Sequence, residues 1–263
     1  MVKKLISETK QLIVKEINHI VTITLNNPKY KNALSEELTP YLRKILKIIS
    51  LNKNYKLLII RGKGDSFCSG GNIKKMLSTD NKKQVLIKDK VDSLIKKQEE
   101  LTYLISSLKI PTIAVVKGAA AGAGFSLALS CDIRIGSPNA FFLSNYSKVG
   151  LSGDYGISWY LVRILGEAKA KEIMFFNERI YSNKAYELGI LNYLIHKDFD
   201  LELEKIIEKI VSQPINAIKL IKMNINFAHN NSLKKSLQLE AKNLIKSSMS
   251  KEHKIAILNF KNS

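Results

Sequence analysis

The chain has 263 residues, of which 45% are hydrophobic and 25% are charged. This length allows one large domain with a substantial core, and the composition is that of an ordinary globular protein rather than a disordered chain. No apolar stretch approaches the length that crosses a membrane, so we expect no membrane partner. The first residues lack the long apolar segment of a signal peptide, and we expect a cytoplasmic location.

The formal net charge of +19 raises the question of a nucleic-acid partner. The positive charge is mostly lysine spread along the chain, without an arginine-rich block or the interleaved aromatic residues of an RNA-reading surface. We therefore favour a polyanionic small molecule over nucleic acid as the partner. The two cysteines, Cys68 and Cys131, do not have the spacing of metal ligands, and we expect no metal site.

The first third of the chain predicts strands and one helix. Residues 11–16 and 20–25 are strand-like and flank Asn18-His19, which is typical of a tight hairpin turn. Ser35 is placed to cap a helix that extends to about Leu51.

Two glycine-rich segments then follow apolar, strand-like runs at 56–61 and 112–117. They read Phe67-Cys-Ser-Gly-Gly-Asn-Ile73 and Gly118-Ala-Ala-Ala-Gly-Ala-Gly-Phe125. A lysine-rich helical pattern covers about 80–109 between them, and a helix over 123–130 and a strand over 132–136 follow the second. Small residues at strand-to-helix turns let backbone N–H groups approach a ligand oxygen, so the two turns together would form a two-donor oxyanion hole. This arrangement indicates chemistry on a thioester carbonyl.

From about Gly156 onward the pattern is helical almost to the end, with helices expected at 201–210, 214–227, 233–245 and 251–260. The alternation of strand, turn and helix before that point predicts an α/β architecture with crossovers. We divide the chain into a ligand-binding core of residues 1–195 and a C-terminal helical oligomerisation region of residues 196–263. The apolar faces of the last helices favour contacts between copies of the chain.

Four segments in this order and spacing resemble the crotonase (enoyl-CoA hydratase/isomerase) superfamily over essentially the whole chain. They are residues 27–35, 67–73, 116–134 and 148–156. The resemblance implies a spiral of ββα units whose C-terminal helices pack trimers, often paired as hexamers. It also implies an acyl-CoA substrate of fatty acid metabolism and no cofactor, because coenzyme A is part of the substrate.

Carried over by position, the resemblance makes the backbone N–H groups of Gly71 and Ala123 the two oxyanion donors. The alternative for the glycines around them is that they only permit a tight turn and close helix packing. Lys31 matches a position that contacts coenzyme A phosphates, although a solvated surface lysine is as common. The remaining substrate-binding candidates are Ser69, Asn72, Ile73 and Tyr146.

Departures from the family pattern bear on the reaction. Hydratases of this family hold a water between two glutamates, and those positions are Ser126 and Tyr146 here, neither of which works as an acid or base near neutrality. Asp154, just ahead of the helix that contains Trp159, stands where some isomerases and the chlorobenzoyl-CoA dehalogenases place a catalytic carboxylate. An apolar pocket would raise its pKa toward the working range. A helix N-cap is the alternative role for Asp154.

We therefore predict an enoyl-CoA isomerase in which Asp154 moves a proton through a dienolate held by the two donors. Two alternatives stay open. Within the family, Tyr146 or Ser126 could assist a hydratase-like, hydrolytic or decarboxylating step, and a dehalogenase would need an activated aryl substrate with Asp154 as the nucleophile. From a different class, the chain could be a non-catalytic member that binds RNA through its positive charge.

Overall fold

The structure is a computed structural model that describes residues 3–5, 9–71 and 86–261. The chain divides into two compact units. The first extends to Leu108 and resumes over Thr112–Phe199, and the second contains Lys109–Pro111 and the residues from Asp200 onward. The expected division after residue 195, into a binding core and an oligomerisation region, stays a prediction.

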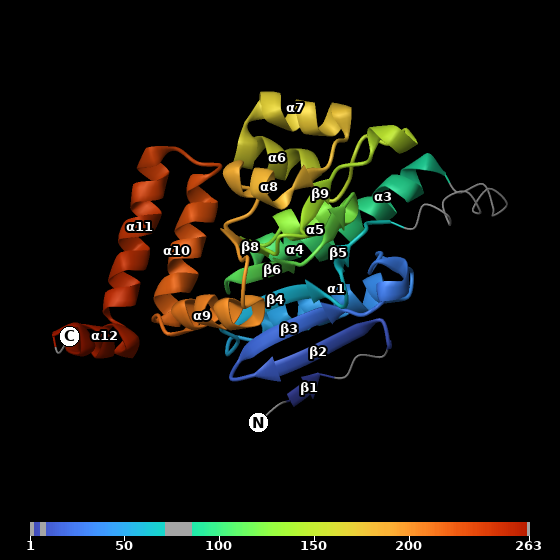
Figure 1. The fold of residues 1–263 in the computed structure, drawn as a ribbon. Coiled ribbons are helices and arrows are strands. Elements are labelled where there is room, and N and C mark those ends of the chain that lie inside the picture. Colours follow the sequence, from blue (N-terminus) through green and yellow to red (C-terminus); the bar gives the residue numbers. More distant parts are fainter. Residues whose placement is uncertain (1–2, 6–8, 72–85, 262–263) are drawn as a thin grey trace. The chain divides into compact units, whose positions relative to one another are not determined.

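Alternating residues build the large sheet of the first unit (Figure 1). Val21, Ile23 and Leu25 are fully buried in one of its strands, while the threonines between them are partly exposed. Across the sheet, the described strands follow the order β1 (Lys3–Leu5), β2 (Leu12–Ile17), β3 (Ile20–Leu25), β4 (Leu57–Gly62), β6 (Thr112–Val116), β8 (Ile133–Gly136) and β11 (Tyr193–Leu194). The pairs from β1 to β3 are antiparallel, and those from β3 to β11 are parallel.

The predicted hairpin is confirmed between β2 and β3. Asn18 and His19 have φ angles of 51° and 66°. A two-residue type I′ turn needs this left-handed conformation at both central residues, and it matches the twist of the flanking strands.

A second sheet continues the strands of the first. Its described strands follow the order β10 (Ile180–Tyr181), β9 (Phe141–Leu143), β7 (Ala119–Ala121) and β5 (Ser66–Cys68). Along the chain β4 leads into β5, β6 into β7 and β8 into β9. A Cβ atom at Gly118 would lie 1.7 Å from the carbonyl oxygen of Asp65, so the corners between the sheets pack too closely for any side chain there. This repeat confirms the predicted α/β architecture of ββα units.

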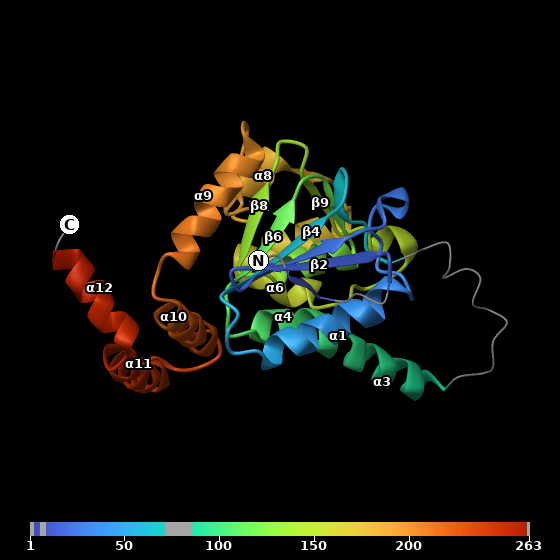
Figure 2. The ribbon, with the colours of Figure 1, turned by 90° about the horizontal axis from the view of Figure 1, so that it is seen from below.

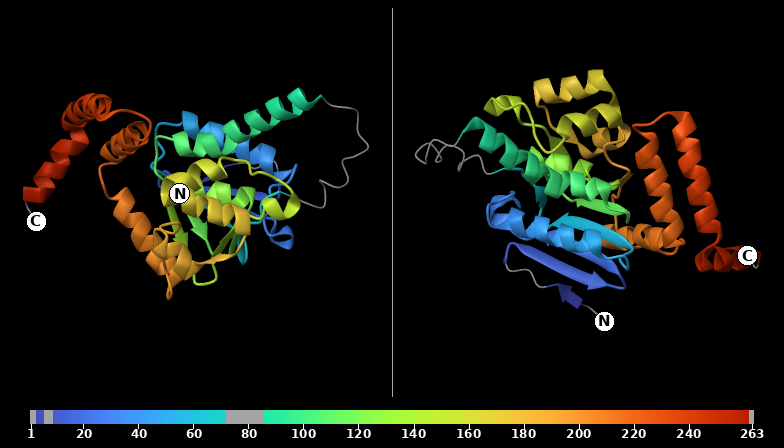
Figure 3. Two further views of the ribbon diagram at one scale, coloured as in Figure 1. Left: turned by 90° about the horizontal axis from the view of Figure 1, so that it is seen from above. Right: turned by 180° about the vertical axis from the view of Figure 1, so that it is seen from behind.

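The helices of the first unit cover both sheets. The described ones are α1 (Leu38–Leu51), α3 (Ile87–Gln98), α4 (Leu104–Ser107), α5 (Ala123–Leu129), α6 (Ile157–Leu165), α7 (Glu167–Phe176) and α8 (Ser182–Glu187). A π-helical turn over Glu99–Tyr103 joins α3 to α4. Helix α1 packs beside α4 (Figures 2 and 3). Phe125 of α5 and Phe142 of β9 are fully buried with ring centroids 5.0 Å apart, which anchors α5 on the second sheet.

Three expectations need correction. The helix expected over about 80–109 begins at Ile87 and ends at Ser107, and residues 80–85 lie outside the described residues. The helix after Ser35 begins at Leu38, because the two residues between them form a turn while the Ser35 hydroxyl accepts a 2.9 Å hydrogen bond from the Leu38 N–H. The region after Gly156 is not helical throughout, since β10 and β11 interrupt it. A strand of two residues is too short to show the alternation of apolar and polar residues from which strands are predicted.

The second unit contains most of the C-terminal helices predicted from the periodicity. They are α9 (Phe199–Val211), which starts at the unit boundary, α10 (Ile215–Ala228), α11 (Leu233–Ser248) and α12 (Lys251–Lys261). Leu233, Leu244 and Ile255 are exposed on these helices. The expectation that such apolar residues join copies of the chain in a trimer or hexamer stays a prediction. Among the helices in the described ranges, none combines the length and the apolar character that a membrane crossing requires.

Candidate active site

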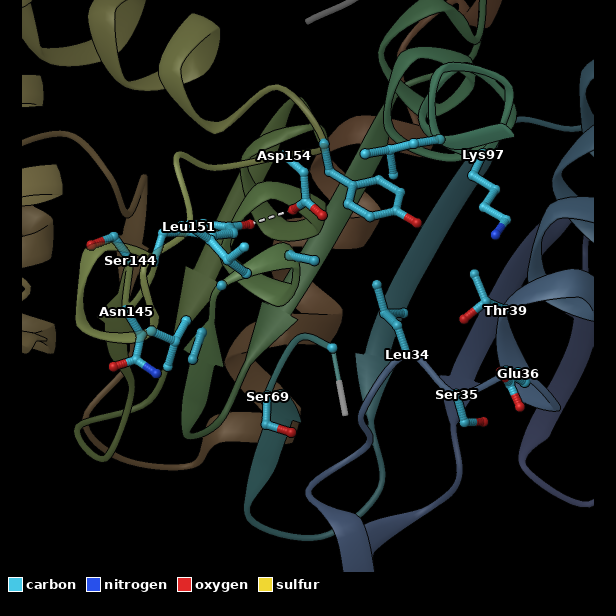
Figure 4. Close-up of a pocket in the computed structure, with 18 of the residues that line it drawn as sticks. Leu34, Ser35, Glu36, Thr39, Ser69, Lys97, Ser144, Asn145, Leu151 and Asp154 are labelled. Atoms are coloured by element: carbon cyan, nitrogen blue, oxygen red, sulfur yellow. Dashed lines mark hydrogen bonds between the residues drawn. The ribbon is translucent and has the colours of Figure 1, made fainter. Parts of the chain in front are cut away.

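A cavity of about 430 Å³ opens in the first unit between the two glycine turns, α1, α3 and the loop before α6 (Figure 4). Five of the sequence-predicted residues line it together: Ser69, Gly71, Ala123, Tyr146 and Asp154. Lys31 is not part of this lining. The remaining candidates, Asn72 and Ile73, lie outside the described residues.

The two glycine turns meet at Gly70. This residue has a φ of +84°, and a Cβ atom on it would lie 2.6 Å from the carbonyl oxygen of Ala121 and 3.1 Å from the amide nitrogen of Ala123. Both the conformation and the close approach therefore require glycine. The Leu34 N–H donates a 2.8 Å hydrogen bond to the Gly70 carbonyl and holds the first turn from its other side.

The two backbone donors are available at this junction. Ala123 is the first residue of α5, where N–H groups have no acceptor within the helix. Within the described part of the chain, neither the Ala123 N–H nor the Gly71 N–H has a hydrogen-bond acceptor. A buried N–H normally has a partner, so this pair suits a ligand oxygen. Gly124 supports the arrangement differently, because a Cβ there would lie 2.1 Å from the Cys68 carbonyl oxygen, so it permits the close packing of α5.

The loop before α1 fixes the first turn through a buried asparagine. Asn32 is fully buried, and its side-chain amide accepts from the Asn27 N–H and donates to the carbonyl oxygens of Lys63 and Ser66 at 2.8–3.0 Å. Its neighbour Lys31 accepts a 3.0 Å hydrogen bond from the Ser69 N–H through its own carbonyl. The Lys31 side chain is exposed, and its contact with coenzyme A phosphates stays a prediction.

The Asp154 carboxylate is bound to Tyr146. The Tyr146 hydroxyl donates to Asp154 Oδ1 at 2.6 Å (Figure 4). Helix α6 begins three residues after Asp154, and it is the main-chain carbonyl of Asp154 that accepts from the Ile157 N–H at 3.3 Å. The carboxylate therefore does not act as the helix cap that was the alternative role.

Burial sets the protonation of this pair. Desolvation raises the pKa of the Asp154 carboxyl above its ordinary value, and the hydrogen bond from Tyr146 partly offsets this. Burial also raises the pKa of the Tyr146 phenol, and the neighbouring Asp154 charge raises it further. The tyrosine thus stays a hydrogen-bond donor, and the aspartate is a carboxylate with increased basicity.

Ser126 completes the support of Asp154. Its side chain is fully buried, and its hydroxyl donates to the Asp154 carbonyl oxygen at 3.1 Å. Ser126 and Tyr146 are the two positions at which the sequence lacks the glutamates of a hydratase. Both side chains instead hold the single aspartate in place.

A strained loop carries Asp154. Gly153, Tyr155 and Gly156 have φ angles of 108°, 53° and 82°. A left-handed tyrosine persists only where its surroundings hold it, and the Gln98 side-chain carbonyl accepts a 2.6 Å hydrogen bond from the Tyr155 N–H. Gln98 was not predicted, because nothing distinguishes it from other polar residues of a lysine-rich helix.

The sequence gives no signal for several further residues of the cavity lining, and three of them are polar or charged side chains on helices. Thr39 and Arg43 line the cavity from α1, and Lys97 lines it from α3. Polar residues on an amphipathic helix are usually solvent-facing, and the sequence carries no signal that these face a cavity.

Comparisons with known proteins agree with this geometry. The sequence profile of the family "Enoyl-CoA hydratase/isomerase" matches residues 15–262. A 1,2-epoxyphenylacetyl-CoA isomerase of Escherichia coli (strain K12) is 30% identical over 226 residues, which is 84% of each chain. A short-chain-enoyl-CoA hydratase of Clostridium acetobutylicum is 30% identical over 224 residues, covering 83% of this chain and 82% of that protein.

The fold agrees as well. The crystal structure of an enoyl-CoA hydratase from Polaromonas sp. JS666 has a TM-score of 0.86 to this chain at 31% identity, covering 95% of this chain and 96% of that one. Two converging donor turns, a ββα spiral and a profile match over nearly the whole length lead to one conclusion: the chain belongs to the enoyl-CoA hydratase/isomerase family of the crotonase superfamily and is an acyl-CoA-processing enzyme.

Proposed function

We propose that this protein is an enoyl-CoA isomerase in which Asp154 transfers the proton. The observation that carries the proposal is the half-buried Asp154 carboxylate, which lines the same cavity as Gly71 and Ala123. A base and a pair of oxyanion donors on one cavity are the groups that enolate chemistry needs.

The reaction follows from these positions. The thioester carbonyl oxygen accepts hydrogen bonds from the Gly71 and Ala123 N–H groups. Asp154 removes a proton from the carbon next to the thioester of a 3-enoyl-CoA, and the electron pair of that C–H bond spreads into a dienolate whose oxygen the donors stabilise. The proton then returns two carbons farther along the chain, leaving the double bond conjugated with the thioester.

Hydration has less support. It would need a second acid or base to hold and activate a water. The Ser126 hydroxyl donates to the Asp154 carbonyl, and the Tyr146 hydroxyl donates to the Asp154 carboxylate. The relatives carry both kinds of name, one being called a 1,2-epoxyphenylacetyl-CoA isomerase and another a short-chain-enoyl-CoA hydratase.

A paired assay tests the proposal. Purified protein is incubated with trans-3-enoyl-CoA and, separately, with trans-2-enoyl-CoA, and the absorbance of the conjugated thioester is followed. We expect conjugation to appear from the 3-enoyl substrate without comparable loss from the 2-enoyl substrate. Rapid formation of 3-hydroxyacyl-CoA from the 2-enoyl substrate would instead identify a hydratase.

Replacing Tyr146 with phenylalanine should shift the acid limb of the pH–rate profile to higher pH. The hydrogen bond from Tyr146 lowers the pKa of Asp154, so its loss leaves the raising effect of burial unopposed. The base works deprotonated, and a higher pKa means that activity is lost at a higher pH as the pH falls. The measurement is kcat/KM against pH, and an unmoved or downward-shifted limb would contradict the prediction.

Tyr160→Phe is the matched control for this experiment. Tyr160 is also buried, but its hydroxyl is bonded to the Ser106 hydroxyl at 2.7 Å rather than to Asp154. We expect the acid limb of the pH–rate profile of Tyr160→Phe to coincide with that of the unmodified protein.

A further inference from the structure

The cavity wall formed by α1 and α3 carries polar groups that isomerisation does not use. Thr39 and Arg43 line it from one face of α1, four residues apart, and Lys97 lines it from α3. In the view of Figure 4, Lys97 and Thr39 lie on the same side of the cavity, away from Asp154. A hydrocarbon acyl chain alone would call for apolar side chains here.

Of these polar groups, Arg43 is the strongest candidate for binding a charged ligand. Its side chain is only 15% exposed, and its ion-pair partner is Glu100, with Nε and Oε2 separated by 3.7 Å. That separation is too long for a hydrogen bond, and the guanidinium makes none to another residue in the described ranges. Glu100 is 46% exposed, so water weakens its attraction for Arg43. The forked guanidinium of Arg43 therefore lines the cavity without a close acceptor in the described ranges.

Two hydroxyl groups near Arg43 also have no hydrogen-bond partner among the residues that the structure describes. Thr39 is 8% exposed, and its Oγ1 is buried without a hydrogen-bond partner in the described part of the chain. Burial and the Asp154 charge raise the pKa of the Tyr155 phenol while the Arg43 charge lowers it, which places this phenol within electrostatic reach of Arg43. The Tyr155 hydroxyl has no hydrogen bond to a described residue either. Buried polar groups are nearly always paired, so a cluster of unpaired ones calls for a ligand.

We propose that the acyl group of the substrate carries a carboxylate, and that Arg43 binds it through the two parallel N–H donors of its guanidinium. Thr39 and Tyr155 lie beside this site, and Lys97 lies at its rim. The inference rests on the proposed function, because it assigns the far end of the substrate whose thioester lies at Gly71 and Ala123. A planar guanidinium is the side chain best matched to a carboxylate. Glu36, which lines the same cavity, opposes this binding, so the cations must outweigh it.

Coenzyme A has phosphates of its own, which are a second source of negative charge for Arg43. The pantetheine arm separates those phosphates from the thioester by many bonds, whereas Arg43 lines the cavity that holds Asp154. The acyl group is therefore the better match, and free coenzyme A distinguishes the two sources in the test.

The test is calorimetric titration with saturated thioesters, which bind but cannot isomerise. The pairs are succinyl-CoA against butyryl-CoA and adipoyl-CoA against hexanoyl-CoA, with free coenzyme A as a third ligand. We expect a carboxylated ligand to bind about tenfold more tightly than its uncharged partner, as a charge-assisted contact of about 1.4 kcal/mol provides. Equal or weaker binding of both carboxylated ligands to the unmodified protein would overturn the inference without any variant.

Variants assign the effect to Arg43. In Arg43→Met the preference should disappear while the affinity for butyryl-CoA and hexanoyl-CoA stays, and Arg43→Lys should recover only part of it because lysine lacks the fork. Lys47→Met, which removes one positive charge from α1 outside the cavity lining, is the matched control and should keep the preference. If Arg43→Met weakens free coenzyme A by the same factor, the anion is a phosphate and the acyl assignment is wrong.

Failure of this inference and failure of the proposed function give different results. If all thioesters bind tightly and equally, the proposed carboxylate on the acyl group is wrong, while the proposed isomerase activity is unaffected. If the protein prefers carboxylated ligands but does not convert 3-enoyl-CoA, the isomerase assignment is wrong, while the carboxylate-binding role of Arg43 is kept.

Discussion

Asp154→Asn is expected to lower kcat for 3-enoyl-CoA isomerisation by about a hundredfold to ten-thousandfold, the range that a positioned general base contributes. The amide oxygen of asparagine can still accept the hydrogen bond from Tyr146, so the loop should keep its geometry. What it loses is the ability to take up a proton. Exchange of solvent deuterium into the carbon next to the thioester should fall by the same factor.

Measuring ligand affinity distinguishes the loss of the base from a loss of the structure of the site. The affinity of Asp154→Asn for a saturated acyl-CoA should stay within a few-fold of the unmodified protein, since Asp154 does not hold the thioester oxygen. A variant that keeps near-normal kcat and deuterium exchange would remove Asp154 from the mechanism. Loss of both binding and turnover would indicate a structural role instead.

Gly70→Ala is expected to lower kcat by about a hundredfold to a thousandfold, the cost of losing an oxyanion donor. The new methyl group would lie 2.6 Å from the Ala121 carbonyl oxygen and 3.1 Å from the Ala123 nitrogen, in a backbone with a φ of +84°. The two turns would have to separate, and the donors would no longer converge on one oxygen. Steady-state kinetics with 3-enoyl-CoA measures the loss.

Gly189→Ala controls for backbone strain. Gly189 has a φ of +75°, but a Cβ atom on it has nothing within 4 Å. Both variants should lose about 1–2 kcal/mol of stability from the left-handed conformation, whereas only Gly70→Ala should lose turnover. Equal kinetic losses in the two variants would show that strain, not donor geometry, is responsible.

The sequence predicted the elements whose signals are local and long. The Asn18-His19 hairpin and the four C-terminal helices were found because turn chemistry and a helical period repeat over enough residues. The second sheet was not predicted as a sheet, since β5, β7 and β9 have three residues each and β10 has two. Strands of this length are defined by their neighbours rather than by their own pattern.

The site was predicted unevenly for a similar reason. Gly71, Ala123 and Asp154 belong to contiguous motifs, so their resemblance to a family could be traced residue by residue. The hydrogen bond between Tyr146 and Asp154 joins two candidates that the sequence did not pair. Arg43 lines the cavity from α1, and Gln98 accepts the hydrogen bond from the Tyr155 N–H from the end of α3. Both helices have the sequence pattern of amphipathic helices, and only their packing in the fold gives these two side chains their contacts.

Helix α5 contains both Ala123 and, one turn later, Ser126, whose hydroxyl holds the main chain of Asp154. In the proposed mechanism, the donor that receives the developing charge and the main chain of the proposed base are therefore both held by one short, buried helix. Buried helices open and move less than surface loops, so the proposed mechanism places one oxyanion donor and the anchor of the base on the less mobile part of the site.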